Sequence, residues 1–117
     1  MLICGIDIGK NHHEACLMDD TGRQIAKTLR FSNTMEGGGR LLDYFAGCNP
    51  AKDTIVVGME ATGHYWLSIY CFLFDQGFQV NVINPIQSDA VRQLFLRKTK
   101  NDAKDSFLIA ETIRIGR

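Results

Sequence analysis

Four carboxylates stand at positions from which they could hold a metal ion. Asp7 lies in an otherwise apolar segment, residues 2–8, where an isolated buried charge is costly unless another group compensates it. Glu60 ends a second apolar segment, and Asp102 and Asp105 lie three residues apart in a predicted helix, so both project from one face. A cluster of these groups could not stay fully ionised without a cation, and all-oxygen ligation suits Mg²⁺ or Mn²⁺ better than zinc. One or two such ions would support phosphodiester cleavage, because they activate a nucleophile and stabilise the leaving oxygen.

The aspartate pair also has a simpler interpretation. Asp102 and Asp105 are typical of a solvated helix start, where the helix dipole favours negative charge. The metal site is favoured by the order of all four carboxylates along the chain. In open α/β sheets, ligands bind beyond the carboxyl ends of parallel strands. If the strands that carry Asp7 and Glu60 are parallel neighbours, the two carboxylates share one end of the sheet, and a helix could add the aspartate pair.

A basic segment extends over residues 90–104. It holds five Lys or Arg residues and one acid, although the whole chain balances 13 basic against 13 acidic residues. Such a patch can contact a phosphate backbone, with an affinity that falls steeply as salt rises. A solvated helix end and, for Lys10, an ordinary turn position remain as alternatives. The candidate residues for nucleic-acid binding are Lys10, Arg92, Arg97, Lys98, Lys100 and Lys104.

The hydrophobic pattern predicts nine elements in the order β-β-β-α-β-α-β-α-α. The first three strands are joined by short turns, including residues 19–22 (DDTG), and predict an antiparallel meander. Polar residues, glycine and proline at residues 32–34 (SNT), 62–63 (TG) and 84–85 (NP) predict helix starts. We therefore expect an α/β fold with a mixed five-stranded sheet and helices on its faces. The strands are predicted at residues 2–8, 12–18, 24–31, 54–59 and 78–83, and the last two helices at residues 85–96 and 102–115.

Composition excludes several classes of protein. With 117 residues, 45% of them hydrophobic and 22% charged, the chain predicts one folded domain rather than disorder. It has no apolar run of the roughly 20 residues that a membrane span needs and no signal peptide, so we expect a cytoplasmic protein without a membrane partner. The four cysteines have no metal-ligand spacing, which argues against zinc and against a disulfide framework.

Other candidate binding side chains have structural interpretations of at least equal weight. His12 and His13 are adjacent on a predicted strand and face opposite sides, so at most one could reach a site. Tyr65 and Trp66 could stack on unpaired bases, but their spacing along an apolar helix is more typical of the core. His64 could contact substrate or lie on the surface of a helix start.

Four motifs together resemble one family. They are residues 5–10 (GIDIGK), 58–65 (GMEATGHY), 84–85 (NP) and 98–105 (KTKNDAKD). In this order, over nearly the whole chain, they resemble the DEDD transposases of bacterial insertion sequences, recombinases that are associated with a bridge RNA. One small departure is Asn101, where the family often has threonine, and it leaves the carboxylates unchanged.

The resemblance implies a RuvC-like domain of the RNase H superfamily over residues 1–117. It implies a tetrad of Asp7, Glu60, Asp102 and Asp105 that binds one or two Mg²⁺ or Mn²⁺ ions, with DNA and a structured guide RNA as partners. The full protein would be a homo-oligomer, a dimer or tetramer, near the bacterial nucleoid. A second, C-terminal domain with a nucleophilic serine would lie outside this chain, and no serine of the chain has a matching context.

Three alternatives remain at the level of sequence. A stand-alone junction-resolving nuclease of the RuvC type would use the same carboxylates without a serine. A non-catalytic nucleic-acid-binding fragment would use only the basic segment. Residues 5–9 (GIDIG) also resemble the first phosphate loop of the actin-like ATPases, but the second phosphate loop and the adenosine motif of that class are absent from the sequence.

Overall fold

The computed structural model describes residues 1–48, 54–98 and 105–116 of the chain. Across these residues the order of strands and helices is the one predicted, and the last helix is described from Asp105. No helix within the described ranges is long and apolar enough to cross a membrane. The elements are β1 (Leu2–Asp7), β2 (His12–Asp19), β3 (Leu29–Ser32), α1 (Met35–Cys48), β4 (Ile55–Glu60), α2 (Trp66–Asp75), β5 (Gln79–Ile83), α3 (Pro85–Lys98) and α4 (Asp105–Ile115).

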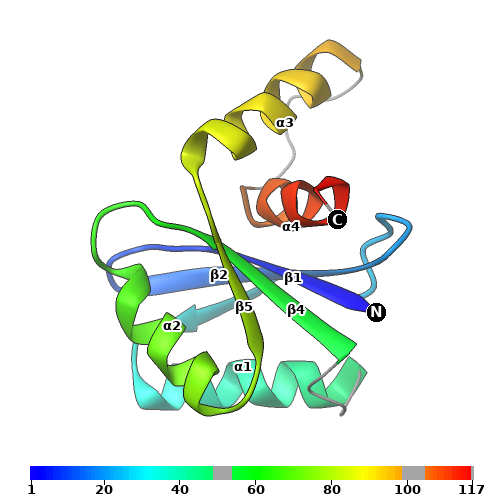
Figure 1. Cartoon of the computed structure of the whole chain (residues 1–117). Helices are drawn as coiled ribbons and strands as arrows, with labels where there is room; N and C mark the ends of the chain where they lie inside the picture. The colour runs from blue at the N-terminus through cyan, green and yellow to red at the C-terminus, as the bar shows by residue number, and fades with distance from the viewer. Residues whose placement is uncertain (49–53, 99–104, 117) are drawn as a thin grey trace.

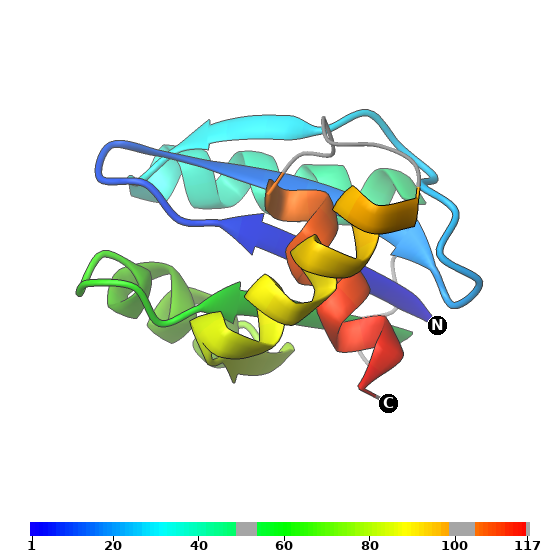
Figure 2. The same ribbon diagram turned by 90° about the horizontal axis from the view of Figure 1, so that it is seen from above.

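The strands form one five-stranded sheet in the order β3-β2-β1-β4-β5. The pairs β1–β2 and β2–β3 are antiparallel, whereas β1–β4 and β4–β5 are parallel. Helices α1 and α2 lie on one face of the sheet, and α4 lies on the other with α3 beyond it (Figure 1). Seen from above, α3 and α4 cross over the sheet together (Figure 2). The mixed sheet with helices on its faces is therefore confirmed.

Strand alternation gives the sheet two separate cores. On β1, Cys4 and Ile6 pack into the core beneath α1 and α2, whereas Ile3 packs into the core beneath α4. The central strand β4 is buried on both faces, as its continuous apolar sequence predicts, with Val56 in the α4 core and Val57 in the opposite core. The odd-numbered residues of β1, such as Ile3, and the even-numbered residues of β4, such as Val56, therefore face α4.

Two of the three predicted helix starts are capped as expected. Thr34 accepts the backbone N–H of Gly37 through Oγ1 at 3.1 Å. Asn84 accepts the N–H of Ile86 through Oδ1 at 2.9 Å, and its own N–H donates to Oε1 of Gln87 at 3.1 Å. These reciprocal bonds form a capping box, which fixes the first turn of α3 directly after β5.

The predicted cap at residues 62–63 is wrong. The N-cap residue of α2 is Tyr65, whose backbone is already helical and which makes no side-chain capping bond. Gly63 instead takes a left-handed conformation with φ of 63°, so the chain turns there before the helix begins. Trp66 follows this turn and packs partly buried against the core beneath α1 and α2, in line with the structural interpretation of this residue.

The third strand is shorter than predicted, because it begins at Leu29 rather than at residue 24. The turn after β2 forms as expected, closed by the Asp19 carboxylate, which accepts the backbone N–H groups of Thr21 and Arg23 at 3.0 Å each. Gln24 forms an isolated β-bridge to Met18. After this bridge, side chains hydrogen-bond to backbone carbonyls that would bond to a neighbouring strand in a longer β3. Gln24 donates to the carbonyl of Ala26 at 2.9 Å, and Tyr44 donates to that of Lys27 at 2.7 Å.

The cysteines divide between the interior and the surface. All four are thiols, with Cys4 and Cys16 buried and Cys48 and Cys71 exposed. Burial raises the pKa of the Cys4 thiol, which keeps it neutral inside the sheet.

Candidate active site

The parallel pairing of β1 and β4 places two of the predicted carboxylates at one end of the sheet. Ile6 on β1 pairs with Met59 on β4, so the next residue of each strand is a carboxylate, Asp7 or Glu60. Both residues have the parity that faces α4, and both are partly buried. The expectation that these strands are parallel neighbours is confirmed.

A glycine in each of these strands lets α4 approach the sheet closely. A Cβ added at Gly5 would overlap the backbone oxygen of Ser106 and the backbone nitrogen of Ala110. A Cβ added at Gly58 would overlap the side chain of Ile113. The backbone of α4 therefore lies directly on β1, two residues before Asp7. Because α4 begins with Asp105, this contact sets the place of the third carboxylate.

The charge of Asp7 responds to the other carboxylates of the site. Its pKa is raised from 3.8 to about 6, first by burial and then by the negative charges of Asp105, Glu14 and Glu60, while Arg92 lowers it. Two predicted tetrad members, Glu60 and Asp105, thus act on the carboxyl of a third, Asp7. The fourth, Asp102, lies outside the described residues.

Glu14 is a site carboxylate that the sequence analysis did not single out. It is the direct cross-strand partner of Asp7 in the β1–β2 pair, so both side chains face the α4 side of the sheet. Its charge is one of the causes that raise the pKa of Asp7. The signal was available in the register of the hairpin, because the strands that flank the turn at residues 8–11 place residue 14 opposite residue 7.

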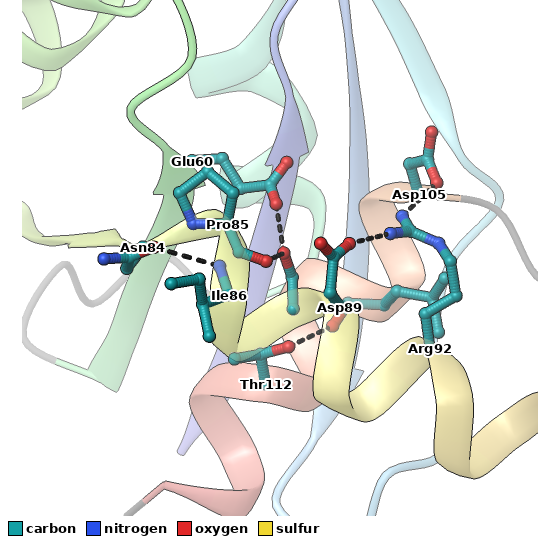
Figure 3. Close-up of polar contacts among 10 residues, drawn as sticks. Glu60, Asn84, Pro85, Ile86, Asp89, Arg92, Asp105 and Thr112 are labelled. Atoms are coloured by element: carbon teal, nitrogen blue, oxygen red, sulfur yellow. Dashed lines mark hydrogen bonds and ion pairs between the residues drawn. The ribbon is translucent and has the colours of Figure 1, made fainter.

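Arg92 on α3 neutralises part of this negative charge. Its guanidinium donates to Oδ1 of Asp89 at 2.9 Å and to Oδ1 of Asp105 at 2.6 Å (Figure 3). The hydrogen bond to Asp105 raises the pKa of Arg92, which therefore stays charged. The side chains of Arg92, Asp89 and Asp105 are 33%, 67% and 55% exposed, so these ion pairs add little stability, typically under about 1 kcal/mol. Arg92 is held over the carboxylates rather than extended into solvent.

Glu60 is bound from the same helix. The Ser88 hydroxyl is hydrogen-bonded to Oε2 of Glu60 and lies 3.0 Å from the backbone carbonyl of Pro85 (Figure 3). The side chain of Ser88 is fully buried, with 0% exposure. Nothing in the sequence pattern distinguished this serine, because its contact depends on how β5 leads into α3.

The structure describes only some of the other predicted binding residues. Lys10 is exposed in the loop that follows β1. His12 is exposed whereas His13 is buried and accepts the N–H of Gly9 through Nδ1 at 3.2 Å, which confirms that they face opposite sides. His64 is exposed. The side chains of Arg97 and Lys98, at the end of α3, and the whole of Lys100 and Lys104 lie outside the described part of the structure.

The chemistry of the donors fits a hard divalent cation, which prefers carboxylate oxygen. Asp7, Glu60, Glu14 and Asp105 offer only such oxygens, and the charges of the other three add to burial in raising the pKa of Asp7. As the side chains lie, no three acidic, histidine or cysteine groups among residues 1–48, 54–98 and 105–116 are arranged to chelate an ion. Asp105 is instead bonded to Arg92. To bind the ion, Oδ1 of Asp105 would have to give up its hydrogen bond to the guanidinium of Arg92.

Asp7 gives the folded chain a pH dependence of defined sign. The folded state binds this proton more tightly than the unfolded state, so the free energy of unfolding falls as pH rises from about 4 to about 6. Above that range Asp7 is ionised in the folded state, and the full cost of its charge lowers the free energy of unfolding. Without divalent ions, Asp7→Asn should therefore raise the free energy of unfolding by about 1–2 kcal/mol near neutral pH and leave it unchanged below about pH 3.5.

This dependence is measured by urea unfolding across the pH range in EDTA. Asp75→Asn is the matched control, because Asp75 is an exposed carboxylate at the far end of α2, and its effect should not vary in this way. A difference between Asp7→Asn and the unmodified chain that stays constant with pH would contradict the electrostatic account of the site.

Comparison with known proteins places this geometry in a family. The family model of the DEDD transposases of the IS110 type, described as transposase, matches residues 4–117. The pilin gene-inverting protein of Moraxella bovis is 28% identical over 106 residues, which cover 91% of this chain and 32% of that protein. The mini-circle putative transposase for IS117 of Streptomyces coelicolor is 29% identical over 114 residues, which cover 97% of this chain and 27% of that protein. The chain thus spans about a third of the length of these relatives.

Among solved structures, the chain is similar to T. thermophilus RuvC in complex with a Holliday junction substrate. The TM-score is 0.68 at 16% identity, and the match covers 99% of this chain and 97% of the other. At this identity the likeness concerns the fold, which is the RNase H-like fold expected from the motifs. With the family match over residues 4–117, it leads to one conclusion. The chain belongs to the DEDD transposases of the IS110 type, and its fold is that of a RuvC-like domain.

Proposed function

We propose that the chain is the metal-binding catalytic domain of a recombinase that cleaves and exchanges DNA strands during transposition of an insertion sequence. The observation that carries this proposal is that Glu60, from the parallel neighbouring strand, and Asp105, from a helix, act on the Asp7 carboxyl, whose pKa their charges raise together with burial. Asp102 would complete the set. Mg²⁺ or Mn²⁺, as one or two ions, would supply stabilisation of the charge that develops on the scissile phosphate.

The chain's own residues have distinct roles in this proposal. Asp7 and Glu60 hold fixed positions at the end of the sheet, and Asp105 is the member that changes partner, from Arg92 to the ion. Arg92, once released, would be free to bind the DNA backbone with the other basic residues of its segment. The serine that attacks, a structured guide RNA and a homo-oligomer would come with the rest of the protein, as the family resemblance implies.

Metal-dependent DNA binding tests this function. We expect the chain to bind labelled duplex and branched DNA several-fold more tightly in Ca²⁺ or Mg²⁺ than in EDTA, because a bound ion would offset the charge of the carboxylates and attract the phosphate. Glu60→Gln should lose this gain and keep the part of the affinity that depends on salt. Neutralising Arg97 and Lys98 together should do the reverse and lower the slope of log affinity against log salt by about 2. The measurement is fluorescence anisotropy across a salt series.

Each departure from this pattern selects another function. An equal metal gain in Glu60→Gln would contradict the site. Salt-dependent binding without any metal gain in the unmodified chain would select the non-catalytic nucleic-acid-binding alternative. Cleavage of branched DNA by this chain with no added serine-bearing segment would select a junction-resolving nuclease.

A further inference from the structure

Helix α3 contacts the carboxylate site at two points that lie one turn apart. Ser88 is bonded to Glu60 at the end of β4, and Arg92, four residues later on the same face of the helix, is bonded to Asp105 at the start of α4 (Figure 3). The buried residues of α3 are Ser88 and Val91, among those whose side chains are described. Helix α3 therefore contacts the carboxylate site through a hydroxyl, that of Ser88, and a guanidinium, that of Arg92.

The Ser88 hydroxyl has one proton and two neighbours that accept hydrogen bonds. The backbone carbonyl of Pro85 can only accept, and an ionised Glu60 carboxylate can only accept. Because a hydrogen bond to a charged acceptor is the stronger one, the proton goes to Oε2 of Glu60 when that carboxylate is ionised. Ser88 therefore holds Oε2 of Glu60 through a hydrogen bond to a charged acceptor.

The backbone fixes this serine firmly. Ile83 of β5 pairs with Glu60 of β4, and the capping bonds of Asn84, from Ile86 and to Gln87, hold the first turn of α3 directly after that pair. Ser88 follows this turn. Its position relative to Glu60 is thus set by a strand pair and a capping box, rather than by a loop.

We propose that Ser88 is a positioning residue for the metal site, which fixes the rotamer of Glu60 through its hydrogen bond to Oε2. This inference rests on the proposed function, in which Glu60 binds a divalent ion. Groups that orient metal ligands in this way typically change metal affinity by about 10- to 100-fold when they are removed. Ser88 itself touches neither the ion nor the DNA.

Mn²⁺ binding to the chain, measured by isothermal titration calorimetry, tests this role. Ser88→Ala should weaken Mn²⁺ binding about 10-fold while the far-ultraviolet circular dichroism stays unchanged. Ser88→Cys keeps the volume and offers a weak donor, so its Mn²⁺ affinity should lie between those of the unmodified chain and Ser88→Ala. This variant serves as the test if the alanine variant does not fold. Ser68→Ala is the matched control, because Ser68 is exposed on α2 and its hydroxyl donates to Asn33 at 3.1 Å, away from the carboxylates; it should leave the affinity unchanged.

A double-mutant cycle shows whether the effect passes through Glu60. In the Glu60→Gln background, Ser88→Ala should cause no further loss of Mn²⁺ affinity, whereas an equal loss in both backgrounds would mean that Ser88 acts on the fold and not on Glu60. Unchanged affinity in Ser88→Ala would also overturn the inference. If Asp7→Asn leaves Mn²⁺ binding intact as well, the proposed metal site itself fails. If Asp7→Asn abolishes binding and Ser88→Ala does not weaken it, only the role of Ser88 fails.

Discussion

Asp7→Asn is expected to remove the stabilisation of the chain by Mn²⁺ and so to reverse the order of stability of the two proteins. At a concentration of about 100 times Kd, an ion that binds only the folded state adds about 2.7 kcal/mol, or about 10 °C in the melting temperature of a domain of this size. In EDTA the variant should melt at a higher temperature than the unmodified chain, because it lacks the unfavourable charge of Asp7. In Mn²⁺ it should melt at a lower temperature, because it lacks a ligand for the ion. Differential scanning calorimetry in both buffers measures this crossing.

Glu36→Gln is the control for this experiment. Glu36 is an exposed carboxylate in the first turn of α1, on the opposite face of the sheet from α4. Its loss should leave the response to Mn²⁺ unchanged. An Asp7→Asn variant that gains as much from Mn²⁺ as the unmodified chain would show that the ion binds elsewhere.

Gly5→Ala is expected to destabilise the chain by about 3 kcal/mol and to abolish the response to Mn²⁺. The added methyl group meets the backbone of α4 at Ser106 and Ala110, which cannot rotate away as a side chain can. The helix must lift from β1, and Asp105, at its first position, moves away from Asp7. Urea unfolding and Mn²⁺ titration measure the two effects.

Two other glycines calibrate this result. At Gly58 the new methyl group would overlap the Ile113 side chain rather than the helix backbone, so Gly58→Ala should cost less than Gly5→Ala. At Gly39, within α1, a Cβ would have no heavy atom within 4 Å, so Gly39→Ala should stabilise the chain by about 0.5–1 kcal/mol through helix propensity. Equal losses at Gly5 and Gly58 would contradict the view that backbone contact with α4 sets the site.

The fold was predictable because strand periodicity and turn residues determine it locally. The Asp19 turn, the buried β4 run and the Asn84 cap all formed where their side chains predict them. The start of β3 was not predictable, because it depends on Gln24 and Tyr44 binding backbone carbonyls, a tertiary contact without a periodic signature. The cap of α2 failed for a related reason, since a left-handed Gly63 turned the chain before the helix.

The site shows the same division. The sequence analysis placed Asp7 and Glu60 at one end of the sheet on the condition that their strands are parallel neighbours, and the pairing of β1 with β4 meets that condition. Glu14 required the register of a hairpin, and Ser88 required the path from β5 into α3, neither of which residue types reveal. Arg92 was predicted as a contact to DNA, and the structure adds its ion pair with Asp105, which links the basic segment to the carboxylates.

The most direct test of the account is a crystal structure of the chain soaked in Mn²⁺, with the ion located by its anomalous scattering. The account predicts a peak about 2.1 Å from carboxylate oxygens of both Asp7 and Glu60, with Asp105 turned from Arg92 toward it and Oε2 of Glu60 still on Ser88. A peak bound to other residues, with Asp7 and Glu60 left apart, would contradict it.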